Sequence, residues 1–271
     1  MELKKSLQTV QWKDLSAPNR WHTSLEIFRP TILCAGAVAT LSLLPGQNWW
    51  AMILLFFGHI AALRAAHGAV HGTLGLSTKA DQQVLYAVSA ALATSCHALE
   101  FTHKLHHKRC AKAEDVEGRI AHLGFWRACL SSPSYHWQVI RAAWRMGDLT
   151  RRKSIALDLG LAAVLHATLF LCIGEPMYWL WSAIAILNGT SGLLSVWIFH
   201  RGGEVTRSGH WAMANWLAMG MLYHGEHHLY PGVPTAKLGE LAARLKASKL
   251  EPEPLFDFQA KGYSSTSSAS T

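Results

Sequence analysis

The sequence predicts an all-α integral membrane protein. We expect four transmembrane helices in two hairpins, inner-face helices that carry histidine clusters, and further interfacial helices. Of the 271 residues, 50% are hydrophobic and only 15% are charged, whereas an ordinary soluble domain has about 25% charged residues. No linker is evident within residues 20–250, so we expect one membrane-embedded domain over residues 1–250, followed by a disordered Ser-rich tail at 251–271.

Two pairs of apolar segments predict the hairpins. A short turn separates the members of each pair, Pro45-Gly46-Gln47-Asn48 in the first and Gly174-Glu175-Pro176 in the second. A helix needs about 20 apolar residues to cross a bilayer, with about 17 as the lower limit. The expected spans are 28–44, 49–66, 155–173 and 177–199.

Other segments are predicted to stay at the membrane surface. Residues 84–99 are apolar but only about 16 in number, which favours a re-entrant or interfacial helix over a full span. Residues 211–223 are also too few to cross. Residues 235–250 have the amphipathic pattern of a helix that lies on the membrane, and residues 104–153 form a polar middle.

The positions of the basic residues predict the topology. With the amino terminus inside, neither outer turn contains a lysine or arginine, so all 25 basic residues fall on the inner side. This pattern follows the positive-inside rule. We therefore expect both termini and all the histidine clusters on the cytoplasmic side, in a bacterial inner membrane. Orientation also accounts for the net charge of +8, which leaves nothing that requires nucleic acid.

Eight of the 16 histidines fall in three short clusters. Residues at i, i+3 and i+4 of a helix share one face, so we expect the histidines of each cluster to converge on one point. A lone histidine in an apolar segment is usually structural, but three such clusters favour transition-metal ligation by imidazole. The clustered residues are His67, His71, His103, His106, His107, His224, His227 and His228.

The number of histidines indicates two metal ions, because eight imidazoles exceed what one ion usually binds. Zinc peptidase chemistry is excluded, because its motif needs a glutamate directly after the first histidine. Gly68 and Lys104 occupy those positions. Two nitrogen-bound irons can activate dioxygen for attack on an unactivated C–H bond, and lipids present such bonds in a membrane.

The three clusters, together with the segment Leu-Tyr-Pro-Gly-Val-Pro at 229–234, resemble the histidine boxes of the membrane fatty acid desaturase superfamily. That superfamily also contains carotenoid ketolases and hydroxylases. The resemblance implies two non-haem iron ions, O2 as co-substrate, and a ninth histidine ligand between the second and third boxes. His200 is our candidate for that ligand, and His97 and His210 are weaker ones.

The sequence departs from the family pattern at one position of the first box. The resemblance also does not specify which acidic residues orient the histidine ligands. Gly68 stands where many members carry an acidic residue, so any hydrogen bond from that position must come from elsewhere. Glu226 keeps the acidic residue of many third boxes. Glu100, Asp115 and Glu117 are candidates to orient other ligands.

The resulting function is oxygen-dependent desaturation of a fatty acyl chain, with a carotenoid ketolase or hydroxylase as the alternative. A distant alternative is a non-enzymatic membrane haem protein, although adjacent pairs such as His106-His107 suit axial haem ligation poorly. The substrate is expected to be a lipid within the bilayer. No His-Pro-Gly-Gly haem-binding segment is present, so electrons should come from a separate donor of ferredoxin or cytochrome type. We interpret the basic residues at 141–153 first as a solvated face beside anionic headgroups. The alternative is that they form a docking surface for this donor.

Overall fold

The computed structural model describes residues 10–17, 19–44, 46–110, 112, 114–202 and 206–255. This part of the chain is mostly helical, and its sheet is a two-residue parallel pairing of β1 (Arg207–Ser208) with β2 (Glu253–Pro254). Four helical stretches are long and apolar enough to cross a membrane, as predicted. They are α2 (Arg20–Leu43), α3 (Asn48–Val70), α8 (Leu149–Ile173), and the stretch from α9 (Pro176–Ser191) through the π-helical η4 (Gly192–Trp197) to α10 (Ile198–His200).

Helices α2 and α8 start before the predicted spans 28–44 and 155–173, because polar residues cap their N-terminal ends. The Asn19 side chain accepts a hydrogen bond from the backbone N–H of Trp21 at the start of α2. The Asp148 side chain does the same for Arg151 at the start of α8. N-terminal caps of this kind satisfy backbone donors that a helix leaves free. Part of the predicted polar middle therefore belongs to the first turns of α8.

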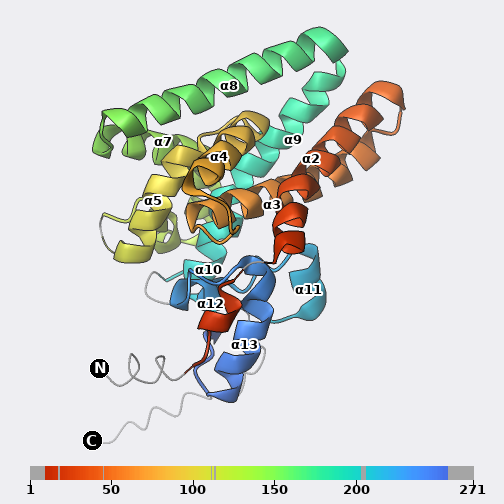
Figure 1. Ribbon diagram of the computed structural model, residues 1–271. Coiled ribbons are helices and arrows are strands. Elements are labelled where there is room, and N and C mark those ends of the chain that lie inside the picture. Colours follow the sequence, from red (N-terminus) through yellow and green to blue (C-terminus); the bar gives the residue numbers. More distant parts are fainter. Residues whose placement is uncertain are drawn as a thin grey trace, which may run out of the picture.

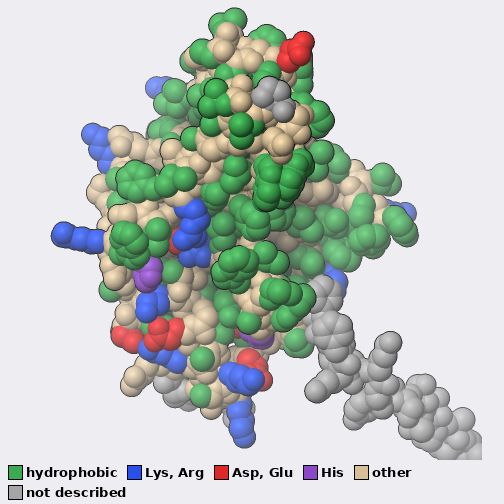
Figure 2. Space-filling view, turned by 90° about the vertical axis from the view of Figure 1, so that its right-hand side faces the viewer, with side chains coloured by type: hydrophobic (Ala, Val, Ile, Leu, Met, Phe, Trp, Pro, Cys, Tyr) green, Lys and Arg blue, Asp and Glu red, His purple; other side chains and the backbone are tan. Residues whose placement is uncertain are grey.

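Helix α3 is the central span. In its most apolar window 61% of the residues are buried, against 17%, 22% and 33% in the other three candidate spans. Helix α2 lies beside α3 (Figure 1), and Gly58 allows their close approach, because a Cβ there would lie 2.9 Å from Sγ of Cys34. Many large side chains of the other spans face outward, and hydrophobic side chains cover much of the face in Figure 2.

We predicted a re-entrant or interfacial helix for residues 84–99, and the structure has a bent pair of helices there. Helix α4 (Thr78–Leu92) and helix α5 (Cys96–Arg109) meet at a bend of 114°. Ala93 has a left-handed backbone with φ of 49° and ends α4, and the Ser95 hydroxyl caps α5 by accepting from the N–H of Ala98. The pair has the shape of a broken span or a re-entrant segment.

Helix α13 (Leu238–Ala247) corrects one prediction, because the protein itself covers its apolar face. Leu241 and Leu245 are fully buried and pack with Leu15 and Tyr230 in one hydrophobic cluster. The apolar side of α13 is thus not free to enter a membrane. The remaining elements are η1 (Lys13–Leu15), η2 (Gly118–His122), α6 (Phe125–Ser131), η3 (Ser132–Ser134), α7 (Tyr135–Met146), α11 (Ala212–Leu217), α12 (His224–Leu229) and η5 (Thr235–Lys237).

The end of the described chain is also packed, beyond the predicted domain boundary at residue 250. Leu255 is buried, and its N–H donates to the carbonyl of Ser208 at 2.7 Å. The Arg201 guanidinium donates to the carbonyl of Leu255. The fold therefore includes residues 251–255, and the rest of the predicted tail lies outside the described residues.

Candidate metal centre

The fold brings all nine predicted histidines together from four regions of the chain. Helix α3 carries His67 in its last turn, and His71 caps its C-terminal end. Helix α5 carries the second cluster, α10 ends at His200, and the short α12 carries the third cluster. Neighbouring imidazole rings have centroids 4.2–6.3 Å apart, as in the pairs His67–His227 and His224–His227.

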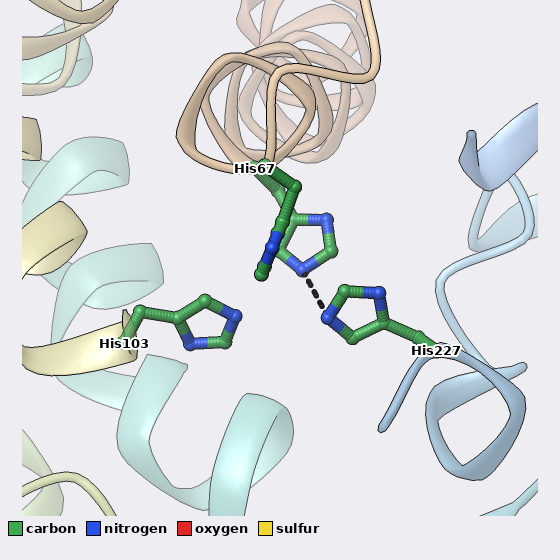
Figure 3. A group of neighbouring side chains, drawn as sticks. His67, His103 and His227 are labelled. Atoms are coloured by element: carbon green, nitrogen blue, oxygen red, sulfur yellow. Dashed lines mark hydrogen bonds between the residues drawn. The ribbon is translucent and has the colours of Figure 1, made fainter. Parts of the chain in front are cut away.

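A first group of four side chains is suited to hold one metal ion. His67, His71, His103 and His227 each offer a nitrogen, and these four atoms lie within 4.8 Å of one another. The Nε2 atoms of His67 and His227 are 3.0 Å apart (Figure 3). Nε2 of His107 also joins this group, at 2.9 Å from Nε2 of His227 and 3.2 Å from Nε2 of His103.

A second group lies beside the first. His106, His200, His228 and Cys110 offer donor atoms within 4.8 Å of one another. Nε2 of His200 lies 3.2 Å from Nε2 of His106 and 2.8 Å from Nε2 of His224. The predictions missed Cys110, although a signal was present. It follows His106 by four residues and so extends the same face of α5.

The second and third clusters divide their histidines between the two groups, whereas His67 and His71 of the first cluster both lie in the first group. This division corrects the expectation that each cluster converges on one point. Within the third cluster, His227 belongs to the first group and His228 to the second. His103 and His106 are divided in the same way. The reason is geometric, because consecutive helical residues point about 100° apart at 3.6 residues per turn. One helix can therefore supply two neighbouring sites.

The side chains present fit metal ions. Nε2 of His71 and Nε2 of His228 are buried and have no hydrogen-bond partner among the described residues, an arrangement that is costly unless something else binds them. Burial, with other histidines close by, lowers the pKa of His224, His227 and His228 well below the usual range. These imidazoles are therefore neutral, the form that ligates metals.

Two carboxylates contact histidines of this centre through the Nδ1 atoms of the imidazole rings. Oδ2 of Asp115 lies 2.8 Å from Nδ1 of His106, and Oε2 of Glu117 lies 3.0 Å from Nδ1 of His103. Both acidic residues follow α5 in the turn before η2. A carboxylate on the far nitrogen of a ligating histidine fixes its tautomer and orientation. This geometry supports the orienting role predicted for Asp115 and the one considered for Glu117.

Two other acidic candidates do not contact the predicted ligands. Glu100 pairs with Lys104 at 2.8 Å and with Arg151, on another side of α5. Glu226 is fully buried and accepts hydrogen bonds from Nε2 of His210, at 2.6 Å, and from the Ser208 hydroxyl. Neither Glu100 nor Glu226 has a hydrogen bond to one of the nine histidines among the described residues, so their orienting role stays a prediction.

The two weaker ligand candidates have other partners. His97 is held between the Asp158 carboxylate, at 2.9 Å from its Nδ1, and the Gln82 amide oxygen, at 3.0 Å from its Nε2. His210 is the partner of Glu226. Neither belongs to the two groups of possible metal-binding side chains.

Gly68, the departure noted in the first box, is explained by packing. A Cβ at this position would lie only 2.7 Å from Cδ2 of Leu74. The backbone turns back directly after the helix, and the N–H of Thr73 donates to the carbonyl of Gly68 at 2.8 Å. A side chain at position 68 would therefore require the Leu74 side chain to shift.

The fold and the site define a membrane protein with a histidine-rich centre that can hold two metal ions. The fatty acid desaturase family model matches residues 47–258, a range that contains all nine histidines. The chain therefore belongs to the fatty acid desaturase family. Searches of curated proteins and of solved structures found no significant match.

Proposed function

We propose that this protein is an oxygen-dependent di-iron enzyme that desaturates a fatty acyl chain within the bilayer. The single observation that carries the proposal is the pair of adjacent histidine groups at the ends of apolar helices. His67 lies in the last turn of α3, and His200 is the last residue of the α9–α10 stretch. A hydrocarbon chain among these helices would have its carbons near both groups.

The proposed ligands are the nine histidines, with Cys110 close to the second group. When bound, two irons in nitrogen-rich surroundings would supply dioxygen activation and an oxidant for a C–H bond. The protein's own part is to hold neutral imidazoles in place through Asp115 and Glu117 and to keep the site partly closed to water. His106 and His200 are each only 2% exposed.

Desaturation by O2 requires an outside electron donor. Removal of two hydrogens from the acyl chain supplies two electrons, and reduction of O2 to two water molecules takes four. A separate redox protein of ferredoxin or cytochrome type would supply the other two. The donor was proposed to dock on the basic residues at 141–153. Within that run, Arg151 and Arg152 donate hydrogen bonds to backbone carbonyls of the protein. Arg141 and Arg145, both on α7, are exposed.

The surroundings of those arginines favour contact with lipid headgroups. Trp137 and Trp144 are exposed on the same helix, at 64% and 44%. Tryptophan and arginine together are typical of a membrane interface. We propose that α7 lies at the headgroups on the cytoplasmic side, with both termini on that side.

The haem alternative fits the geometry poorly. Axial haem ligands approach the iron from opposite faces of a flat ring, which must fit between them. Here Nε2 of His227 lies within 3.0 Å of Nε2 atoms of both His67 and His107. That spacing suits small ions bound by several imidazoles.

The proposal is tested by expression in two hosts, one with ordinary membrane lipids and one that makes β-carotene, followed by mass spectrometry of both lipid pools. We expect a new double bond in acyl chains. A keto or hydroxy carotenoid with unchanged acyl chains would contradict acyl desaturation and would favour the carotenoid alternative.

Metal analysis tests the ligand set separately. Purified protein should contain about two non-haem irons per chain, and replacement of His103 or His227 by alanine should lower the iron content and abolish turnover. The matched control is His122→Ala, because His122 is exposed and belongs to neither group. Full iron and turnover in the His103 variant, or a haem absorption band in the wild type, would refute the proposed site.

A further inference from the structure

A large apolar cavity lies among α2, α3, α4, α8 and α9, apart from the metal centre. Its volume is about 550 Å³, and its lining is mainly aliphatic. A cavity of roughly 150 Å³ holds benzene, and sites for larger ligands occupy about 300–1,000 Å³. This cavity is therefore large enough for a stretch of hydrocarbon chain.

The cavity follows one face of α3 toward the metal centre. Leu55, His59, Ala62 and Ala65 line it from that helix, and Ala65 precedes His67 by two residues. With a rise of 1.5 Å per residue, His59 lies about 12 Å along the helix from His67. None of the nine histidines is among the described residues that line the cavity. The cavity is thus placed to hold a part of a lipid chain that lies away from the reacting carbon.

One side chain in this lining is not apolar and has no partner. His59 is 5% exposed, and neither its Nδ1 nor its Nε2 has a hydrogen-bond partner among the described residues. His166, which also lines the cavity, differs in this respect. Its Nε2 lies 3.1 Å from the carbonyl of Ala90, and its Nδ1 accepts from the Trp181 indole at 3.0 Å. His59 therefore has hydrogen-bonding capacity that the protein leaves unused.

A trapped water would satisfy His59 poorly. A buried water needs two to four polar partners, and most of the lining is aliphatic. A neutral imidazole can donate one hydrogen bond and accept another. An oxygen substituent on an otherwise apolar chain matches both the lining and the imidazole, and a hydroxyl group can use either nitrogen.

We propose that the cavity binds the distal part of a long-chain lipid, and that His59 hydrogen-bonds a hydroxyl or carbonyl oxygen on that part. The identification of this lipid as the substrate rests on the proposed desaturase function. His59 acts here as a specificity-determining residue, because a chain without the oxygen leaves its imidazole unpaired.

Direct binding tests this assignment without turnover. The full-length protein in nanodiscs is titrated with octadecanoate and with monohydroxyoctadecanoates that differ in the position of the hydroxyl group. One hydrogen bond to a buried group corresponds to roughly a five- to ten-fold change in affinity. We expect the wild type to prefer one hydroxy isomer over octadecanoate by about that factor.

Three variants give the comparison. His59→Leu should abolish the preference and leave octadecanoate binding nearly unchanged, whereas His59→Gln, which keeps a donor and an acceptor, should retain a preference. The control Ile53→Leu changes an exposed residue of α3 that does not line the cavity and should behave as the wild type. No preference for any isomer in the wild type, or a preference that survives in His59→Leu, would overturn the assignment.

A fourth variant tests whether the cavity is the binding place. Ala91→Trp fills it from α4 and should weaken binding of octadecanoate and of the hydroxy isomers alike, and unchanged binding would overturn the proposal. Failure of the desaturase function gives a different result, namely absence of iron or of a product double bond with the binding preference intact.

Discussion

Oδ2 of Asp115 lies 2.8 Å from Nδ1 of His106, and both side chains are almost completely buried. Asp115 also accepts a hydrogen bond from the N–H of Gly118 through Oδ1 at 2.8 Å. The carboxylate is therefore fixed from two directions and holds one imidazole of the second group in a single orientation.

The variant Asp115→Asn tests this relationship. The amide keeps the size of the carboxylate but loses its charge, so His106 is held less firmly in the ligating tautomer. Loss of such an outer contact typically lowers metal affinity about 10- to 100-fold, and we expect a fall of that order in iron retention against a chelator. The control is Glu114→Gln, because Glu114 is exposed next to it. Equal iron retention in the two variants would contradict the role of Asp115.

Two glutamates near α5 should separate stability from metal binding. Glu117→Gln is expected to lower iron content, because Glu117 contacts Nδ1 of His103. Glu100→Gln should instead lower the melting temperature with iron content unchanged, because Glu100 pairs with Arg151 and Lys104. The expected loss is about 1–3 kcal/mol, since a charge-assisted hydrogen bond is removed from a buried group. Iron loss in Glu100→Gln would mean that this residue does act on the centre.

The packing of Gly68 predicts that a side chain there is harmful. Gly68→Ala should destabilise the protein by about 1–3 kcal/mol through overpacking against Leu74, and Gly68→Asp should cost more and reduce iron content. Addition of Leu74→Ala should restore part of the loss. The control Gly160→Ala lies on an exposed part of α8 with nothing near its Cβ and should be neutral or stabilising. Thermal unfolding and iron analysis of the four variants measure these effects.

The contact between His210 and Glu226 predicts a pH dependence. The hydrogen bond to Glu226 raises the pKa of His210 above its usual value of 6.5. The stabilisation from this pair is therefore complete below the unfolded pKa and is lost as the pH rises through the folded one. We expect His210→Gln to lower the melting temperature more at pH 6 than at pH 9. The exposed His122, changed to Gln, serves as the control, and a larger effect of His210→Gln at pH 9 would show that the sign is wrong.

The resemblance to the histidine-box pattern suggested His200, whereas the sequence by itself determined the helical class, the four candidate spans and the eight clustered histidines. These features are local. Apolar length identifies a span, and the spacing of a histidine cluster identifies a helix face whatever that face meets. The same reasoning did not locate the bend within the predicted re-entrant or interfacial helix at 84–99, because a left-handed residue such as Ala93 has no clear signature in composition.

Only the tertiary structure decided which side chains belong to each group of possible metal ligands and which ones have other partners. It divided His227 from His228 between two groups, added Cys110 to the second, and assigned Glu100 to an ion pair while Glu117 holds His103. It also placed His59 in an apolar cavity, where its ring nitrogens have no hydrogen-bond partner among the described residues. The physical reason is that these outcomes depend on which helices meet and in which direction each side chain points, and spacing along one helix does not contain that information.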